Sequence, residues 1–290
     1  MSQAFTAYNT RIITPPTGGM IPTAPVRKNI LLVALALGLL IPVVLIFIRE
    51  NMNTTVRGRK DLEGLTVPFI GEIPLYGKTK KRIFKKSHFE GQMLVVKGGS
   101  RDVINEAFRV LRTNLEFMSH KDDKSNVIVI TSFNPGSGKS FLTMNIAVSL
   151  AIKNKKTLVI DGDMRHASAS AYVGSPEKGL SDYLNGRIEN VQDIIVTDKG
   201  YESLNILPVG VIPPNPTELL FDKRLKQLID TVRERYDYVL IDCPPVELVA
   251  DTQIIEKLAD RTIFVVRAGL LERSMLAELE NLYDENKYKN

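Results

Sequence analysis

The stretch VIVITSFNPGSGKSFLTMNIAVSLA, residues 127–151, contains a glycine-rich loop between an apolar, β-favouring run and a run with helical spacing. Gly136 and Gly138 allow backbone N–H groups to turn inward around phosphate oxygens, and the positive N-terminus of the following helix adds to the attraction. The usual phosphate-binding loop reads G-x-x-x-x-G-K-[S/T], yet Phe133 stands at the position of the first glycine. The stretch predicts a nucleotide site with an unusual start, unless Gly-Lys-Ser occurs here by chance.

Each position of this loop has an expected role. Lys139 is expected to reach the β- and γ-phosphates of ATP, and the hydroxyl oxygen of Ser140 to bind Mg²⁺. The residues expected to bind the nucleotide are Pro135, Gly136, Ser137, Gly138, Lys139, Ser140 and Phe141.

Two further apolar runs end in carboxylates. YVLIDCPP predicts a strand that ends at Asp242, the type of carboxylate that holds Mg²⁺ in P-loop proteins. LVIDGDMR ends a separate strand with Asp161 and Asp163, which suit Mg²⁺ coordination or activation of an attacking hydroxyl. We expect Ser140, Asp161 and Asp242 at the metal, with Lys139 and either Asp161 or Asp163 acting in catalysis. One aspartate at a strand end is often only a helix cap, but three signals in P-loop order favour ATP and Mg²⁺ as cofactors.

The pattern from residue 101 onward predicts an α/β fold. Apolar runs at 126–132, 156–163, 203–210, 236–245 and 259–269 read as strands, and runs at 102–118, 139–152, 179–186 and 217–236 read as helices. Alternating strands and helices imply a mostly parallel sheet covered on both faces, with ligands at the carboxyl ends of the strands. We therefore expect a P-loop NTPase fold, preceded by one transmembrane helix.

The transmembrane helix is predicted by 19 uncharged residues, Ile30 to Ile48. At about 1.5 Å per residue such a helix spans roughly 28 Å, close to the thickness of the hydrocarbon layer. A cleaved signal peptide is disfavoured, because the run is long, 29 mostly polar residues precede it and no A-x-A-like site follows. Pro42 is a tolerated kink.

The predicted domains follow from this span. Residues 1–29 form a proline-rich, extracytoplasmic segment, 30–48 the span, 49–100 a basic cytoplasmic linker, and 101–290 the P-loop domain. Lys and Arg are more frequent after the span than before it, which favours a cytoplasmic C-terminal side. The net charge of +5 is modest and suits an anionic membrane at least as well as nucleic acid, so we expect no nucleic-acid partner. A single cysteine, Cys243, excludes an internal disulfide framework.

SFNPGSGKS, LVIDGDMR and VLIDCPP together resemble the Walker A, Walker A′ and Walker B motifs of bacterial tyrosine kinases. In that family the loop typically begins Ser-x-x-Pro, as in Ser132–Pro135. The related partition ATPases typically carry a lysine where this chain has Asn134, so the resemblance favours the kinases.

Glu106, Arg109 and Arg112 form a second family motif, Glu-x-x-Arg-x-x-Arg. By itself this spacing favours a series of surface ion pairs, worth a few tenths of a kcal/mol each. The resemblance instead implies an oligomer interface, in which these residues contact a neighbouring subunit in a ring.

PFIGEIP, residues 68–74, after a membrane span resembles the linker of polysaccharide co-polymerases, which many bacteria fuse to the kinase. The resemblance implies an inner-membrane kinase that phosphorylates itself on tyrosine and controls the synthesis and export of capsular or exopolysaccharide. Its implied partners are the polysaccharide machinery and a cognate tyrosine phosphatase.

The sequence departs from that family at both ends. Members normally have an earlier span with a periplasmic domain, and they end in a further strand and a tyrosine cluster; here Tyr283 and Tyr288 are the late tyrosines and the candidate phospho-acceptors. We therefore expect a kinase domain truncated at its C-terminus. Two alternatives stay open: a membrane-tethered ATPase switch, and a scaffold that binds nucleotide without turnover.

Overall fold

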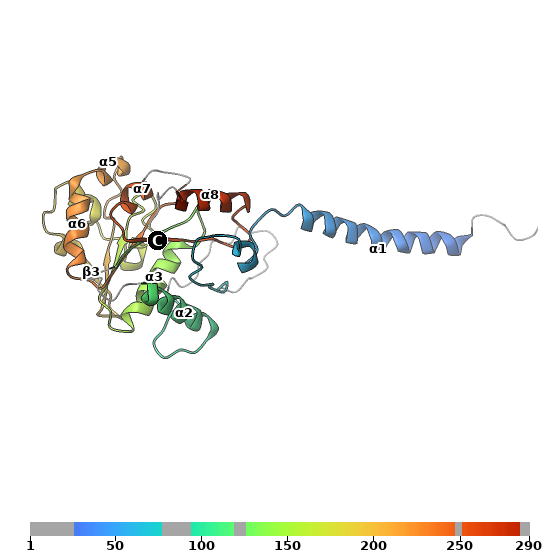
Figure 1. Cartoon of the computed structure of the whole chain (residues 1–290), viewed down its shortest axis with the longest axis horizontal. Coiled ribbons are helices and arrows are strands. Elements are labelled where there is room, and N and C mark those ends of the chain that lie inside the picture. Colours follow the sequence, from blue (N-terminus) through green and yellow to red (C-terminus); the bar gives the residue numbers. More distant parts are fainter. Residues whose placement is uncertain (1–25, 77–93, 119–125, 247–250, 285–290) are drawn as a thin grey trace, which may run out of the picture. The chain divides into compact units, whose positions relative to one another are not determined.

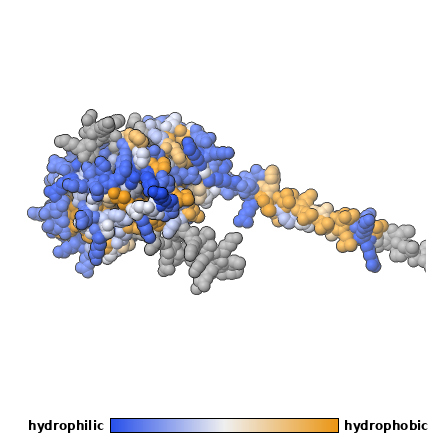
Figure 2. All heavy atoms as spheres, turned by 90° about the horizontal axis from the view of Figure 1, so that it is seen from below, coloured by the Kyte–Doolittle hydropathy of each residue, from blue (hydrophilic) through white to orange (hydrophobic). Residues whose placement is uncertain are grey.

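The computed structural model describes residues 26–76, 94–118, 126–246 and 251–284, and it divides into two units, Met1–Asn53 and Thr54–Asn290. The first unit contains one long helix, α1 (Arg27–Asn51), whose most apolar stretch has a mean hydropathy of 3.2. None of its residues is buried, and its apolar side chains form the orange length in Figure 2. By length and composition this helix is able to cross a membrane, and it contains the predicted span.

The second unit is built on a six-stranded sheet with the order β3-β4-β2-β5-β1-β6 (Figure 1). The strands are β1 (Asn126–Thr131), β2 (Thr157–Asp161), β3 (Val196–Thr197), β4 (Leu204–Leu207), β5 (Tyr238–Asp242) and β6 (Arg261–Phe264). All neighbouring pairs are parallel except β3 with β4. The predicted mostly parallel sheet is therefore confirmed.

Helices cover both faces of this sheet. On one face, α3 (Lys139–Ala151) packs on the sheet and α2 (Val103–Met118) packs on α3, in the apolar cluster that contains Ile128, Ile130 and Leu240. On the other face, α4 (Leu180–Leu184), α5 (Pro216–Leu220), α6 (Lys223–Arg233) and α7 (Asp251–Glu256) contribute buried side chains to the apolar cluster that contains Val129 and Ile241. The remaining helices are α8 (Ser274–Asp284) and the short η1 (Arg59–Leu62), η2 (Ser170–Val173) and η3 (Val191–Ile194).

One predicted helix is wrong in its extent. The sequence favours a continuous helix over 217–236, but the structure ends α5 at Leu220 and begins α6 at Lys223. The side chain of Asp222 accepts a hydrogen bond from the backbone N–H of Arg224 at 2.8 Å, so Asp222 caps a new helix instead of continuing the old one.

Part of the basic segment after α1 packs on the P-loop unit. The backbone of Val56 exchanges hydrogen bonds with Leu271 and Gly269, each of 2.8 Å. Val56 is buried with Phe133 and with three leucines of α8 in a small apolar cluster: Leu276, Leu279 and Leu282. This region of the predicted 49–100 linker is thus continuous with the fold that carries the loop.

Candidate nucleotide site

The register of the sheet brings the predicted site together. Ile130, at the end of β1, lies opposite Asp242 on β5, and Asp161 on β2 lies opposite Asp242 from the other side. Because these three strands are parallel, their carboxyl ends meet at one edge, where the glycine-rich loop connects β1 to α3.

The loop has the backbone conformation that its glycines permit. Gly136 and Gly138 have φ of 73° and 96°, in the left-handed region that L-residues rarely adopt. A Cβ atom at either position would meet no atom within 4 Å, so backbone conformation, not crowding, calls for glycine here. The hydroxyls of Ser132 and Ser137 both donate to the backbone oxygen of Asn134, at 2.8 and 2.7 Å, and close the loop on itself.

Phe133, at the position of the usual first glycine, is a core residue. Its side chain is 3% exposed and packs on Phe264 of β6, with ring centroids 4.7 Å apart. The start of the loop is therefore anchored by apolar packing to β6 and α8.

Arg267, just beyond β6, also holds the loop. Its guanidinium donates to the backbone oxygen of Gly136 at 2.6 Å. The sequence did not predict this contact, because Arg267 lies 131 residues after Gly136 and belongs to no motif that connects the two positions.

Lys139 begins α3 and is buried at the strand ends. Burial lowers the pKa of its ammonium group, and the negative charges of Asp242 and Asp163 act in the opposite direction. A buried cation among carboxylates is placed to bind anionic phosphate oxygens.

Asp242 is completely buried, and neither of its carboxylate oxygens has a hydrogen-bond partner among the described residues. Burial, together with the negative charge of Asp161, raises the pKa of this carboxyl to about 7, and Ser140 and Lys139 act in the opposite direction. A bound cation would satisfy this carboxylate.

Asp161 is also fully buried, and its two oxygens have different surroundings. Oδ2 accepts hydrogen bonds from the backbone N–H and the hydroxyl of Ser170, at 2.7 and 2.6 Å. Oδ1 has no partner in the described part of the chain. Burial raises the pKa of Asp161 to about 6, with the Ser170 hydrogen bonds acting in the opposite direction. Sequence reasoning missed Ser170.

Asp163 is less buried than the other two carboxylates. It accepts hydrogen bonds from the backbone N–H groups of Arg165 and His166 at 3.2 and 3.1 Å, and the His166 ring lies 3.3 Å from it. These contacts are those of a cap on the turn after β2. The same turn is tied to two helices by buried Asp251, which accepts from Arg165 at 3.3 Å and from Thr217 at 2.5 Å.

These residues fit a magnesium-bound nucleotide. No three His, Cys, Asp or Glu side chains within residues 26–76, 94–118, 126–246 and 251–284 form a protein-only metal site. Mg²⁺ usually binds one or two carboxylates together with substrate phosphates, and the unsatisfied oxygens of Asp161 and Asp242 beside the loop match that arrangement.

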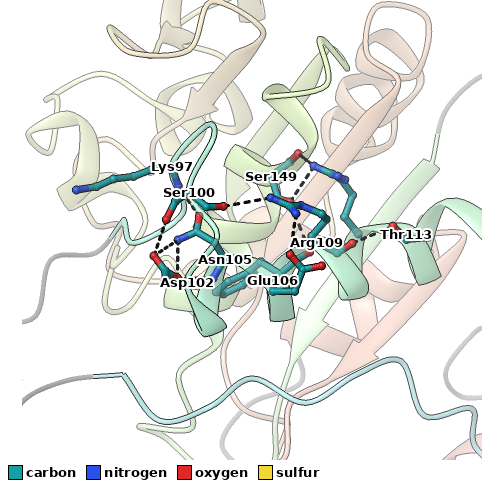
Figure 3. Close-up of polar contacts among 10 residues, drawn as sticks. Lys97, Ser100, Asp102, Asn105, Glu106, Arg109, Thr113 and Ser149 are labelled. Carbon is teal, nitrogen blue, oxygen red and sulfur yellow. Dashed lines mark hydrogen bonds and ion pairs between the residues drawn. The ribbon is translucent and has the colours of Figure 1, made fainter.

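The Glu-x-x-Arg-x-x-Arg motif divides into two environments on α2 (Figure 3). Glu106 and Arg109 form an exposed ion pair of 2.7 Å, and Arg109 also donates to the backbone oxygen of Ser100. Arg112 is buried instead, and donates to the backbone oxygen of Ser149 in the last turn of α3 at 2.7 Å. Arg112 therefore joins two helices of the same subunit.

Of the two candidate phospho-acceptors, Tyr283 and Tyr288, one lies among the described residues. Tyr283 is half-buried on α8. Tyr288 lies outside the described residues.

A parallel sheet with this loop, a buried lysine after it and carboxylates on two neighbouring strand ends defines a P-loop nucleotide-binding protein. Residues 125–285 match the family described as AAA domain. Over 294 residues the chain is 34% identical to the putative tyrosine-protein kinase AmsA of Erwinia amylovora, covering 98% of this chain and 39% of AmsA.

Two solved structures of tyrosine kinase domains are similar to this chain in fold and sequence. The kinase domain of the Escherichia coli tyrosine kinase ETK superposes with a TM-score of 0.66 at 30% identity, covering 78% of this chain and 86% of that domain. The BceF tyrosine kinase domain gives a TM-score of 0.67 at 32% identity, covering 80% of this chain and 95% of that domain. The chain belongs to the AAA-domain family, in the branch formed by the bacterial tyrosine kinase domains. It spans about two fifths of the length of the curated relatives it matches.

Proposed function

We propose that this chain is an ATP-dependent protein-tyrosine kinase that transfers the γ-phosphoryl group to tyrosine hydroxyls, including those of other copies of itself. The observation that carries the proposal is the meeting of Lys139, Asp161, Asp163 and Asp242 beside a glycine loop, in a chain that is 30–32% identical to two solved tyrosine kinase domains.

The loop and its neighbours have the binding tasks. When bound, magnesium and ATP supply the phosphoryl group and neutralise charge at its oxygens. The loop N–H groups and Lys139 bind the phosphates and stabilise the negative charge that shifts during transfer. Ser140, Asp161 and Asp242 hold the metal. The remaining nucleotide contacts come from Pro135, Gly136, Ser137, Gly138 and Phe141.

Asp163 is the better candidate for the group that accepts the tyrosine proton. A tyrosine hydroxyl has a pKa near 10, so its attack at neutral pH needs a base or a strong orienting acceptor. Asp161 is 0% exposed and has Oδ2 occupied by Ser170, whereas Asp163 is 7% exposed and accepts its two backbone hydrogen bonds on Oδ1. An incoming side chain can therefore reach Asp163 more directly.

We propose that α2 contacts a neighbouring subunit of a ring-like homo-oligomer. Beside the Glu106–Arg109 pair, α2 exposes Val103, Val110 and Phe117, which are spaced by seven residues and so lie on one side of the helix. Val103 is 76% and Phe117 82% exposed. An apolar row beside charged side chains has the character of a protein interface, and Arg112 supports it from inside.

The membrane assignment is proposed on the length and composition of α1 together with the family resemblance. We propose an inner-membrane location with the kinase domain in the cytoplasm, fusion to a polysaccharide co-polymerase, and a role in capsular or exopolysaccharide synthesis and export. A cognate tyrosine phosphatase would reverse the reaction.

The test is incubation of the full chain in detergent with labelled ATP and Mg²⁺. Phosphotyrosine is expected, and Lys139→Met should abolish it, because a neutral side chain cannot bind the phosphates. Lys153→Met is the matched control, since Lys153 is exposed and pairs with Glu116 at 3.0 Å. Release of free phosphate without phosphotyrosine would show that the chain is an ATPase switch and not a kinase. Nucleotide binding without hydrolysis or phosphotyrosine would show that it is a scaffold.

A further inference from the structure

We propose that Tyr76 is a tyrosine phosphorylation site, modified by the nucleotide site of a second copy of this chain. This inference rests on the proposed kinase activity and names its acceptor. Tyr76 is 42% exposed, and it is the one exposed tyrosine among residues 26–76, 94–118, 126–246 and 251–284.

The other described tyrosines are committed to the fold. Tyr183, Tyr236 and Tyr238 are buried. Tyr172 is half-buried and donates its hydroxyl to Asp198 at 2.8 Å; burial and this carboxylate raise the pKa of the phenol, which opposes deprotonation.

Two more tyrosines, Tyr201 and Tyr283, are held less tightly but are not exposed. Tyr201 is half-buried, with its hydroxyl 3.4 Å from the backbone oxygen of Val96. Tyr283 is half-buried within helix α8. An acceptor ring must leave its own surroundings to enter another site, and each of these rings would first have to give up packing or a hydrogen bond.

The backbone around Tyr76 can make such a movement at low cost. Residues 66–76 form neither helix nor strand. Ile73 is the last residue of this segment that packs on the core, and Leu75 is 74% exposed. Three residues of extended chain reach about 10 Å from that anchor. Residues 74–76 therefore form a short exposed segment beyond this anchor.

The residues just before this segment lie against α2. The side chain of Asn114 donates to the backbone oxygen of Ile70 at 2.6 Å, and Gly71 lies so close to α2 that a Cβ there would be 3.3 Å from Leu111 Cδ1. Helix α2 also carries Glu106 and the exposed apolar row. The segment that contains Tyr76 is therefore attached beside the surface that we assign to the neighbouring subunit. This placement favours transfer between copies.

Charge complements this placement. Lys78, Lys80, Lys81 and Arg82 follow Tyr76 in the sequence. A site loaded with ATP carries its triphosphate and three aspartates against Lys139 and a magnesium ion, so it is net negative. A basic segment is attracted to such a site.

The reaction balances with the groups already named. The phenol oxygen of Tyr76 forms a bond to the γ-phosphorus, and the bond from that phosphorus to the β,γ-bridging oxygen breaks with its electron pair leaving on ADP. The phenol proton passes to Asp163 of the other copy.

Trypsin makes the test specific. Cleavage after Lys60 and Lys78 releases residues 61–78, in which Tyr76 is the single tyrosine. The full chain in detergent, incubated with ATP and Mg²⁺, should yield this peptide with one added phosphate on Tyr76. Tyr76→Phe should remove that phosphopeptide while leaving ATP hydrolysis and phosphorylation of an added tyrosine polymer unchanged. Tyr201→Phe is the control and should retain the phosphopeptide.

Mixing two versions of the chain tests transfer between copies. Wild-type chain is incubated with isotope-labelled Lys139→Met chain, which cannot phosphorylate itself. Phosphate on Tyr76 of the labelled chain is expected. Its absence there, with Tyr76 phosphorylated on the wild-type chain, would overturn transfer between copies. Phosphotyrosine at other positions but never in residues 61–78 would overturn the Tyr76 site and leave the kinase intact. No phosphotyrosine at all would overturn both.

Discussion

Ser170 and Asp161 form the closest polar contact between a site carboxylate and the rest of the fold. The Ser170 hydroxyl donates to Asp161 Oδ2 at 2.6 Å, and the same hydroxyl accepts from the backbone N–H of Val209 at 2.8 Å, beyond the end of β4. Because both hydrogen bonds of the hydroxyl are fixed, Oδ2 is held in place and Oδ1 is left without a partner among the described residues. Ser170 is thus a positioning residue for the proposed metal site.

Ser170→Ala is expected to weaken metal binding. The change removes the hydroxyl hydrogen bond to Oδ2 and leaves only the backbone N–H of residue 170 to hold that oxygen. Loss of such a supporting contact typically costs about 10-fold or more in metal affinity. Titration of the ATP-bound protein with Mn²⁺, followed by electron paramagnetic resonance, measures this directly.

Ser170→Thr is the control, since it keeps the hydroxyl. A purely structural role for Ser170 predicts that both variants lose thermal stability while metal affinity stays at the wild-type value. That result would contradict the positioning role.

Arg267→Ala is expected to weaken ATP binding without unfolding the domain. Arg267 is exposed and contacts the loop through the backbone oxygen of Gly136. Loss of one such bond costs about 1 kcal/mol, or roughly a fivefold weaker affinity. Calorimetric titration with ATP checks the affinity, and Arg273→Ala, which loses an ion pair with Asp61 instead, serves as control. Equal affinities in both variants would show that the loop does not depend on Arg267.

Arg112→Met and Arg109→Met should separate stability from assembly. Arg112 is buried on Ser149, so its loss should lower the free energy of unfolding by about 2–3 kcal/mol. Arg109 is in an exposed pair, so its loss should cost about 0.5 kcal/mol or less but reduce the oligomer. Chemical denaturation and analytical ultracentrifugation measure the two effects. An Arg109→Met chain that keeps its full oligomer would exclude Arg109 from the interface.

The sequence was sufficient for most of the sheet. Strands β1, β2 and β5 are buried along their whole length, as expected of parallel strands covered on both faces, and so they appear as unbroken apolar runs. The two-residue strand β3 and the six-residue helix α7 are too short to give a periodic signal, and they were not predicted.

The sequence predicted those site residues whose charged side chains stand at the end of an apolar run or directly after the glycine loop. Asp161 and Asp242 end apolar runs, and Lys139 follows a glycine loop, so their positions could be inferred from order alone. Ser170 and Arg267 were not predictable, because each acts through a contact set by the folded path of the chain, and neither belongs to a recognisable spacing.

Phe133 interrupts the usual glycine pattern of the loop. If the loop needed glycine at this position, Phe133→Gly would improve nucleotide binding. The structure predicts the opposite, because Phe133 is buried on Phe264 and joins the cluster that contains Val56 and α8. Deleting a buried phenyl ring typically costs about 3–5 kcal/mol, and glycine would also loosen the backbone.

Phe133→Gly should therefore lower the unfolding free energy by at least that range and weaken ATP binding, because the loop loses its anchor. Phe133→Leu keeps most of the apolar contact and should cost about 1.5 kcal/mol or less. Thermal denaturation with and without ATP separates the two effects for both variants. A Phe133→Gly protein with wild-type stability and tighter ATP binding would show that the ring only occupies the place of a missing glycine. Destabilisation with weaker binding would instead make Phe133 the point where the nucleotide loop is fastened to the segment that follows α1.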